Sequence, residues 1–161
     1  MVITIWDSKG ESSYPSKTTL HWSGYSSKNK IDSIPKFLDD NADQLRERYL
    51  SFIHEFGENR ILNKTLINYL KCEQSFSFWW TTLLAEKNYI KSPRIFDCLR
   101  LLALDKKLKD FKPKTLRLVS NDKTLAKALK EYSLSKGLNF KWKKIKKNKD
   151  LKSYSLFLLY K

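Results

Sequence analysis

The stretch TLRLVSNDKTLAKALKEYSLSKGLNFKWKKI, residues 115–145, carries the clearest pattern of secondary structure in the chain. Its apolar residues Leu116, Leu118 and Val119 are typical of a short strand, and the following Ser-Asn-Asp supplies residues that begin helices. The next apolar residues recur at helical spacing and are Leu125, Ala128, Leu129 and Tyr132. Gly137 ends this pattern, and residues 139–145 alternate aromatic side chains with lysine. Strand, helix and strand in this order predict a βαβ unit with two parallel strands.

Two further strands are expected near the N-terminus, at VITIW (2–6) and TTLHW (18–22), because both are short and rich in β-branched residues. Together with the βαβ unit they predict an α/β fold, a Rossmann-like half with a helical insertion at residues 33–108. The chain is expected to form a single domain. Its parts would be strands and loop at 1–32, the insertion at 33–108, the βαβ unit at 109–150 and an apolar tail at 151–161.

Four helices are predicted within the insertion from apolar spacing and capping residues. The first begins at Ser33 and Pro35 and ends at Gly57, and the second begins at Asn63. A third is expected over residues 76–86, and a fourth begins at Ser92 and continues through Leu104.

Charge is unevenly distributed along the 161 residues, whose net charge is +15. Residues 1–105 have a net charge of +1, whereas residues 106–161 have a net charge of +14. A basic third of this kind faces nucleic acid, an anionic membrane or a phosphate-bearing ligand, or else it is only a solvated lysine-rich surface. No run approaches the roughly 18 apolar residues that a membrane-spanning helix needs, and the N-terminus does not resemble a signal peptide.

Metal binding is not expected, because Cys72 and Cys98 are 26 positions apart and His21 and His54 are the only histidines. Two reduced, mostly buried thiols in a cytosolic protein fit this spacing better than a disulfide framework. Each histidine is interpreted as a satisfied surface or half-buried residue. Hydrolase, metalloprotease, P-loop and dinucleotide-binding motifs are absent from the sequence.

The turn between the first strand and the helix of the βαβ unit is the first candidate ligand site. Ser120, Asn121 and Asp122 would lie at the carboxyl end of a parallel strand, where α/β sheets bind ligands. The alternative is that Asn121 or Asp122 only caps the helix.

The second candidate site is WWTTLLAEKNYIKSP, residues 79–93. Trp79 and Trp80 either stack on a ligand or belong to a helix that is buried on two sides. Residues 86–88, Glu-Lys-Asn, are placed at the end of that helix, where they can project into a cleft.

The segment SFSFWWTTLLAEKNYIKSPRIFDCLRLLALDKKL (residues 75–108) resembles bacterial surface-carbohydrate biosynthesis proteins of O-antigen and capsule gene clusters, which look like glycosyltransferases with two Rossmann domains. The matching residues are Trp79, Trp80, Leu83, Leu84, Glu86, Lys87, Asn88, Lys91, Ser92, Pro93, Ile95, Asp97, Leu99 and Arg100 to Leu104. The resemblance covers about 30 residues. The resemblance by itself does not identify a catalytic residue.

This resemblance implies an N-terminal, acceptor-side domain, with the nucleotide-sugar donor bound by a second Rossmann domain that 161 residues do not supply. The chain stops inside the apolar run 153–161, so it is expected to be part of a longer enzyme or a truncated form, and to be inactive alone. Glu86 is the candidate catalytic base, and the alternative is that Glu86 only pairs with a lysine or caps a turn. The candidate substrate-binding residues are Trp79, Trp80, Lys87, Asn88, Lys91, Ser92, Ser120, Asn121 and Asp122.

The expected partners are a lipid-linked or saccharide acceptor and an anionic membrane at the cytoplasmic face. The lysines expected to contact the membrane are Lys143, Lys144, Lys146 and Lys147. Two other functions stay open. One is a basic nucleic-acid-binding module, in which Phe140, Trp142 and Tyr154 stack on bases. The other is a non-enzymatic interaction domain that uses the helices and the tail 154–160.

Overall fold

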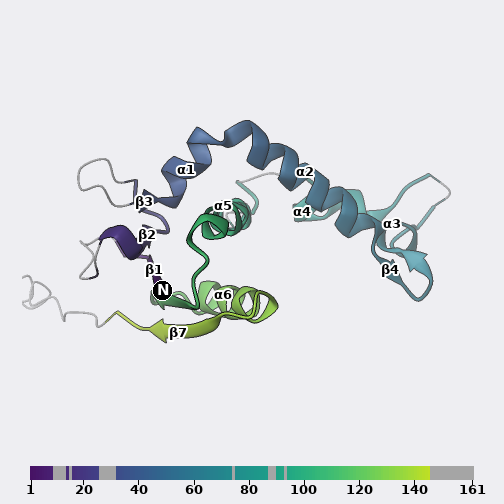
Figure 1. The fold of residues 1–161 in the computed structure, drawn as a ribbon. Helices are drawn as coiled ribbons and strands as arrows, with labels where there is room; N and C mark the ends of the chain where they lie inside the picture. Colours follow the sequence, from purple (N-terminus) through teal and green to yellow (C-terminus); the bar gives the residue numbers. More distant parts are fainter. Residues whose placement is uncertain are drawn as a thin grey trace, which may run out of the picture.

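The computed structural model describes residues 1–8, 14, 16–25, 32–73, 75–86, 90–92 and 94–145. Within them, five parallel strands form one sheet in the order β3-β2-β1-β6-β7. The strands are β1 (Val2–Trp6), β2 (Thr19–His21), β3 (Asp32–Ser33), β6 (Thr115–Val119) and β7 (Asn139–Lys143). The predicted α/β, Rossmann-like half fold is confirmed, because the sheet is parallel and helices flank it (Figure 1).

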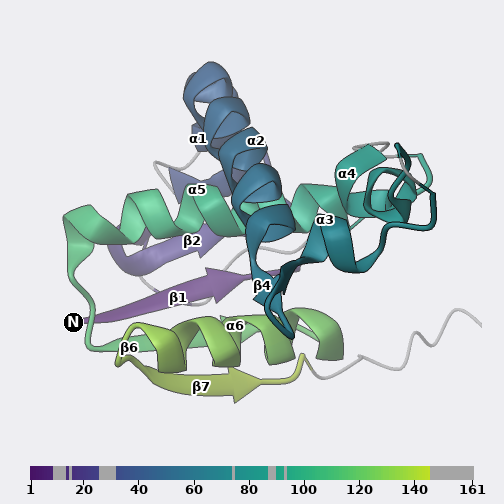
Figure 2. The same cartoon turned by 90° about the vertical axis from the view of Figure 1, so that its right-hand side faces the viewer.

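The core lies on one face of this sheet. Central strand β1 places Ile5 between Leu20 of β2 and Leu118 of β6, and each of these side chains is at most 2% exposed. Three helices cover this face: α1 (Ile34–Asp40), α5 (Ile95–Phe111) and α6 (Lys123–Ser135). Figure 2 shows α5 and α6 running along the sheet, and the apolar side chains of the two layers form one cluster.

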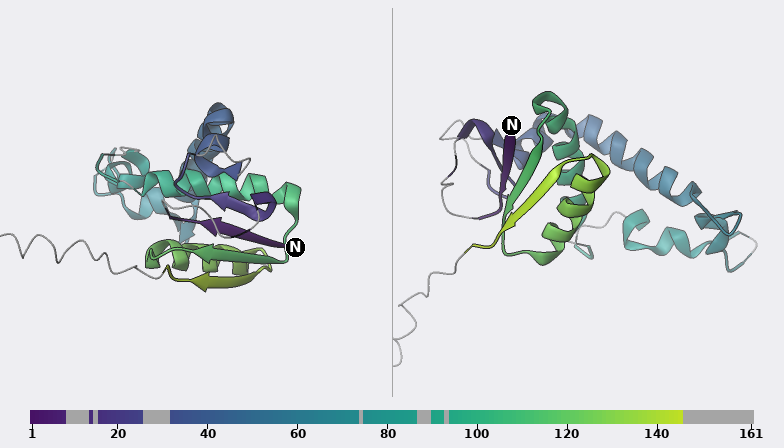
Figure 3. Two further views of the ribbon diagram at one scale, coloured as in Figure 1. Left: turned by 90° about the vertical axis from the view of Figure 1, so that its left-hand side faces the viewer. Right: turned by 60° about the horizontal axis from the view of Figure 1, so that its bottom comes forward.

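The second face of the sheet is covered differently. Side chains alternate along a strand, so Thr4 and Trp6 of β1 point away from the helices. Tyr14 lies there against Trp6, with ring centroids 6.2 Å apart, and 4.9 Å from the guanidinium of Arg117. The described part of the β1–β2 connection also contains the short 3-10 helix η1 (Ser16–Thr18) (Figure 3).

The βαβ prediction is confirmed by β6, α6 and β7, whose two strands pair in parallel. Asp122 is the N-cap of α6, since its carboxylate accepts hydrogen bonds from the backbone N–H groups of Thr124 and Leu125. Gly137 follows α6 with a φ of 66°, a conformation that glycine adopts without strain. Local sequence therefore determines both ends of this helix.

The single helix predicted from Ser33 to Gly57 is wrong, because the chain forms two helices there, α1 and α2 (Ala42–Glu58). Ser33 caps α1 as expected. Asn41 then interrupts the helix by donating from its side chain to the carbonyl of Phe37, 2.9 Å away. Gly57 does not stop α2: a Cβ there would lie 3.0 Å from Trp79 Nε1, so the glycine permits close packing.

The start of the predicted second helix is also displaced. Asn63 does not cap a helix; Leu62 and Asn63 have positive φ values of 49° and 65° and form the two-residue turn between β4 (Arg60–Ile61) and β5 (Lys64–Thr65). Thr65 instead caps the short helix α3 (Leu66–Tyr69) through the N–H of Asn68.

A continuous helix over residues 76–86 is wrong as well. The chain there forms a bridge from Ser77 to Lys71, the 3-10 helix η2 (Phe78–Thr81) and one α-helical turn, α4 (Leu83–Glu86). Ser77 donates its hydroxyl to the carbonyl of Ile67 at 2.6 Å and accepts from the N–H of Trp79. Thr82 is extended between η2 and α4, with a ψ of 145°. Local side-chain hydrogen bonds thus replace the helical ladder.

The expected insertion contains two kinds of helix. Helices α1 and α5 pack on the sheet, and α5 runs past Leu104 to Phe111. Residues 42–86, here called the helical arm, comprise α2, β4, β5, α3, η2 and α4 and extend away from the sheet (Figures 1 and 3). The arm has its own small cluster, in which Tyr49, Ile53 and Trp79 are buried together with Ile95 of α5. None of the helices in the described part of the chain is long and apolar enough to cross a membrane.

Candidate functional site

The carboxyl edge of the sheet is the candidate site. Here this name means residues 7, 21–24, 120–122 and 143–145, which follow β1, β2, β6 and β7. The chain proceeds from β1 outward to β3 on one side and from β6 to β7 on the other, so the strand order reverses between β1 and β6. In open α/β sheets ligands bind at the carboxyl ends of strands beside such a reversal. The predicted residues Ser120, Asn121 and Asp122 lie there.

Asp7 is the centre of the hydrogen bonds at this edge. One carboxylate oxygen accepts from the hydroxyl of Ser120 at 2.7 Å, and the other accepts from the hydroxyl of Ser23 at 3.0 Å. The carboxylate therefore links the ends of β1, β2 and β6. Sequence reasoning missed Asp7, although a carboxylate directly after a buried strand was a visible signal; the neighbouring strand ends that give it a role are distant in sequence.

Asp122 has two roles at the start of α6. One oxygen of its carboxylate accepts from the N–H groups of Thr124 and Leu125, and the other accepts from Arg94 at 2.7 Å. The hydrogen bond from Arg94, supported by the two backbone N–H groups, lowers the pKa of Asp122. The capping interpretation is thus confirmed, and the cap occupies two N–H groups that a phosphate at this helix end would need.

Arg94 connects the segment before α5 to the β6–α6 turn. Besides Asp122, Arg94 donates to Asp97 at 2.8 Å. The hydrogen bonds to Asp122 and, to a smaller extent, to Asp97 raise the pKa of Arg94. Asp97 also accepts from Arg100 at 3.1 Å and from the indole N–H of Trp22 at 3.2 Å. Lys91 and Ser92, two other candidate residues, are close neighbours of Arg94 in the chain. The structure therefore brings the start of α5 to this edge, whereas Trp79, Trp80 and Glu86 lie in the helical arm.

His21, at the end of β2, is more buried than expected. It is 8% exposed, and its Nε2 has no hydrogen-bond partner among the described residues. Burial lowers its pKa, so the imidazole is neutral at pH 7. A Cβ on Gly24 would lie 3.0 Å from His21 Nδ1, so the glycine allows the loop to fold tightly over the ring. The other histidine, His54, is exposed on α2.

The end of β7 is fixed against the 120–122 turn. Trp142 donates its indole N–H to the carbonyl of Ser120 at 2.9 Å, and the Asn121 side chain accepts from the N–H of Ile145 at 3.0 Å. Lys143 and Lys144, two lysines expected to contact anions, are therefore beside the candidate ligand residues, and both are exposed. Lys146 and Lys147 lie outside the described residues.

The two tryptophans of the second candidate site have different environments. Trp79 is 2% exposed within the arm, and its Nε1 has no hydrogen-bond partner among the described residues. Trp80 is 57% exposed. Glu86 ends α4 and forms an ion pair with Lys91. Lys87 and Asn88 lie outside the described residues.

The carboxyl edge combines hydroxyl groups, carboxylates and two exposed lysines. Such groups can form hydrogen bonds with polar and anionic groups. The described residues contain no group of three His, Cys, Asp or Glu side chains that could hold a metal ion. Searches of protein-family models, curated proteins and solved structures find no match to this chain.

Proposed function

We propose that this chain is the N-terminal, acceptor-side domain of a glycosyltransferase-like protein that acts in bacterial surface-polysaccharide biosynthesis. The observation that carries the proposal is the hydrogen bond between Arg94 and Asp122. It joins the segment that resembles surface-carbohydrate proteins to the turn after β6, next to the strand reversal. A ligand at this edge would contact both segments together.

The acceptor is a saccharide or a lipid-linked saccharide in this proposal. Ser23, Ser120 and Asp7 are suited to its hydroxyl groups, and Lys143 and Lys144 are suited to a phosphate. Trp80 has the exposed ring that stacking on a sugar needs, whereas Trp79 is packed in the arm. Glu86, beside Lys91, is the proposed base in a complete enzyme. The nucleotide-sugar donor belongs to another domain, because the turns after β1 and β6 lack a glycine-rich phosphate loop.

Titration of the isotope-labelled chain with chitotriose, a soluble saccharide probe, tests the proposal. NMR shift changes are expected at residues 7, 23, 94 and 120–122. These changes should reach a plateau as the saccharide concentration rises. Arg94→Gln should weaken binding about tenfold, since it breaks the connection between the two segments. Arg46→Gln, which changes an exposed arginine on α2, is the matched control. Saturable shifts confined to other surfaces, or tight binding of UDP at the carboxyl edge, would contradict an acceptor-side role.

Placement at the inner face of the membrane is part of the same proposal. The chain should bind vesicles containing phosphatidylglycerol more strongly than vesicles of phosphatidylcholine, and salt should weaken this binding. The double variant Lys143→Glu/Lys144→Glu should lose most of it. The control Lys127→Glu/Lys130→Glu reverses the same number of charges on α6. Equal losses in both variants would show that net charge alone determines binding.

A further inference from the structure

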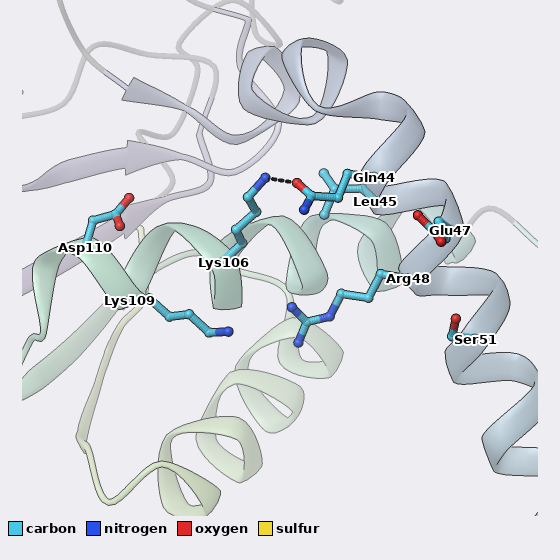
Figure 4. Close-up of a pocket in the computed structure, with 8 residues that line it drawn as sticks. All are labelled: Gln44, Leu45, Glu47, Arg48, Ser51, Lys106, Lys109 and Asp110. Atoms are coloured by element: carbon cyan, nitrogen blue, oxygen red, sulfur yellow. Dashed lines mark hydrogen bonds between the residues drawn. The ribbon is translucent and has the colours of Figure 1, made fainter.

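A groove separates α2 of the arm from α5 of the sheet layer. Its volume is about 540 Å³, and Arg48, Lys106 and Lys109 are among its lining residues (Figure 4). A smaller hollow of about 170 Å³ lies between α5 and α6, where Lys112 and Lys136 contribute to the wall. Lys109 lines both, so the two hollows adjoin along α5. Five cations, from α2, α5 and the residues directly after α5 and α6, thus line two neighbouring hollows.

A buried carboxylate holds two of these cations in place. Asp105 is 8% exposed and accepts from Arg48 and Lys136, each at 2.8 Å, and from the hydroxyl of Tyr132 at 3.0 Å. Burial alone would raise the pKa of Asp105, but the hydrogen bonds from Lys136 and Tyr132 and the charge of Arg48 bring it below its ordinary value. The single negative charge of Asp105 therefore holds the two positive charges of Arg48 and Lys136, and the group of three keeps a net charge of one positive unit.

The other groove lysines are not neutralised by acids. Lys106 donates to the amide oxygens of Asn41 and Gln44, which carry no charge. Lys109 forms no ion pair with any described acid. The two acids that line the groove, Glu47 and Asp110, form no ion pair with any described cation. Figure 4 shows the Lys109 amine and the Arg48 guanidinium pointing toward one another across the groove, with the Asp110 carboxylate directed away.

Like charges that converge repel each other, and this repulsion is relieved when an anion binds between them. The volume of the groove falls in the range of roughly 300–1,000 Å³ that is typical of small-molecule sites. Arginine binds phosphate oxygens through two parallel N–H groups, and lysine adds a mobile charge. The arrangement thus matches a phosphate group better than a carboxylic acid with a single charge.

We propose that this groove, together with the smaller hollow beside it, binds a phosphate-bearing small molecule through Lys109 and Arg48 of the groove and Lys136 of the hollow. The site is independent of the carboxyl edge, because twelve residues of α5, a rise of roughly 18 Å, separate Asp97 from Lys109. Its failure would therefore leave the proposed acceptor site untouched. Asp105 is a positioning residue here, since its carboxylate accepts from both Arg48 and Lys136.

Inorganic pyrophosphate is the probe, titrated into the intact chain at 150 mM salt so that diffuse attraction is screened. Calorimetry should show one saturable site, and NMR shifts should concentrate on residues 44–51 and 105–110. Lys109→Ala should weaken binding about tenfold or more and leave the melting temperature nearly unchanged, because the residue is exposed. Lys127→Ala is the control: it removes one charge from an 80% exposed side chain on α6 and should leave the affinity unchanged.

Three results would overturn the proposal. The first is an equal loss of affinity in Lys109→Ala and Lys127→Ala, which would indicate attraction by net charge. The second is a Lys109→Ala variant that melts earlier but binds pyrophosphate normally, which would assign Lys109 to the stability of the C-terminal turn of α5. The third is binding that depends on Lys109 but is stronger for a single-stranded oligonucleotide than for pyrophosphate, which would make the ligand a nucleic acid.

Discussion

The sheet layer and the helical arm use similar apolar residues but bury them to different extents. In the sheet layer, Ile3, Ile5 and Leu118 are completely buried under α5 and α6. In the arm, three buried residues form a cluster with Ile95 of α5, while Phe78 and Trp80 are 56% and 57% exposed. In a parallel sheet the connecting helices pack on the face of the strands and complete an apolar layer, whereas short helices and turns can leave aromatic faces uncovered. Because burial of apolar side chains is more complete in the sheet layer, we expect most of the free energy of unfolding to come from that layer.

The largest effect on stability is expected from a substitution in the central strand β1. Ile5→Asp puts a charge between Leu20 and Leu118, where no partner is available among the described neighbours, and should prevent folding because the cost exceeds the few kcal/mol of a typical domain's stability. Trp80→Asp, at an exposed position of the arm, should leave the circular dichroism spectrum and the melting curve nearly unchanged. A folded Ile5→Asp variant would show that the sheet is not the main source of stability.

The second prediction concerns the independence of the arm. Trp79→Ala removes the largest buried side chain of the arm cluster and should cost the arm about 3–5 kcal/mol. Hydrogen exchange should then accelerate in α2 and α3, while amides of β1 and β6 keep their protection. Phe56→Ala, at a partly exposed neighbour whose ring centroid is 5.8 Å from that of Trp79, should have a smaller effect in the same region. Equal loss of protection in the sheet would mean that both regions unfold as one unit.

The third prediction concerns the contact between the two regions, where Asp105 of α5 binds Arg48 of the arm. The folded-state pKa of Asp105 lies below its ordinary value of 3.8, so its contribution to stability is complete above that value. It is lost as the pH falls through the lower folded-state pKa. Asp105→Asn should destabilise the chain by about 1–3 kcal/mol at pH 7 and should flatten the dependence of stability on pH below 4.

Denaturant unfolding at several pH values measures this effect. Asp110→Asn, an exposed carboxylate on the same helix, is the control and should keep the wild-type profile. If Asp105→Asn shows the same acid dependence as the wild type, other carboxylates control it.

The smallest predicted effect is local and lies within the sheet layer. Asp122→Ala removes the cap of α6 and the ion pair with Arg94, and should cost about 0.5–2 kcal/mol. Asp122→Asn keeps an amide oxygen for the backbone N–H groups and should recover most of the loss in thermal denaturation. An Asn variant as unstable as the Ala variant would indicate that the ion pair with Arg94 matters more than the cap.

The sequence-based predictions were more accurate in the sheet layer than in the helical arm. β6, α6 and β7 were predicted closely, because their strand pattern, the cap Asp122 and the stop Gly137 all agree. In the arm, the predicted helix over residues 76–86 was wrong, and Asn63 was assigned to a cap instead of a hairpin turn. Apolar spacing alone does not distinguish a helix from short turns when Ser77 and Thr82 offer the backbone other hydrogen bonds.

The sequence by itself determined the parallel α/β class, the ends of α6 and the placement of Ser120, Asn121 and Asp122 after a buried strand, since these depend on local patterns. Only the tertiary structure decided that Asp7, Ser23 and Ser120 meet, that Arg94 reaches Asp122, and that Arg48 of α2 and Lys136, directly after α6, both bind Asp105. These contacts join residues that are 16 to 113 positions apart. Which side chains meet at such separations depends on strand order and helix packing, and periodicity along the chain carries no information about either.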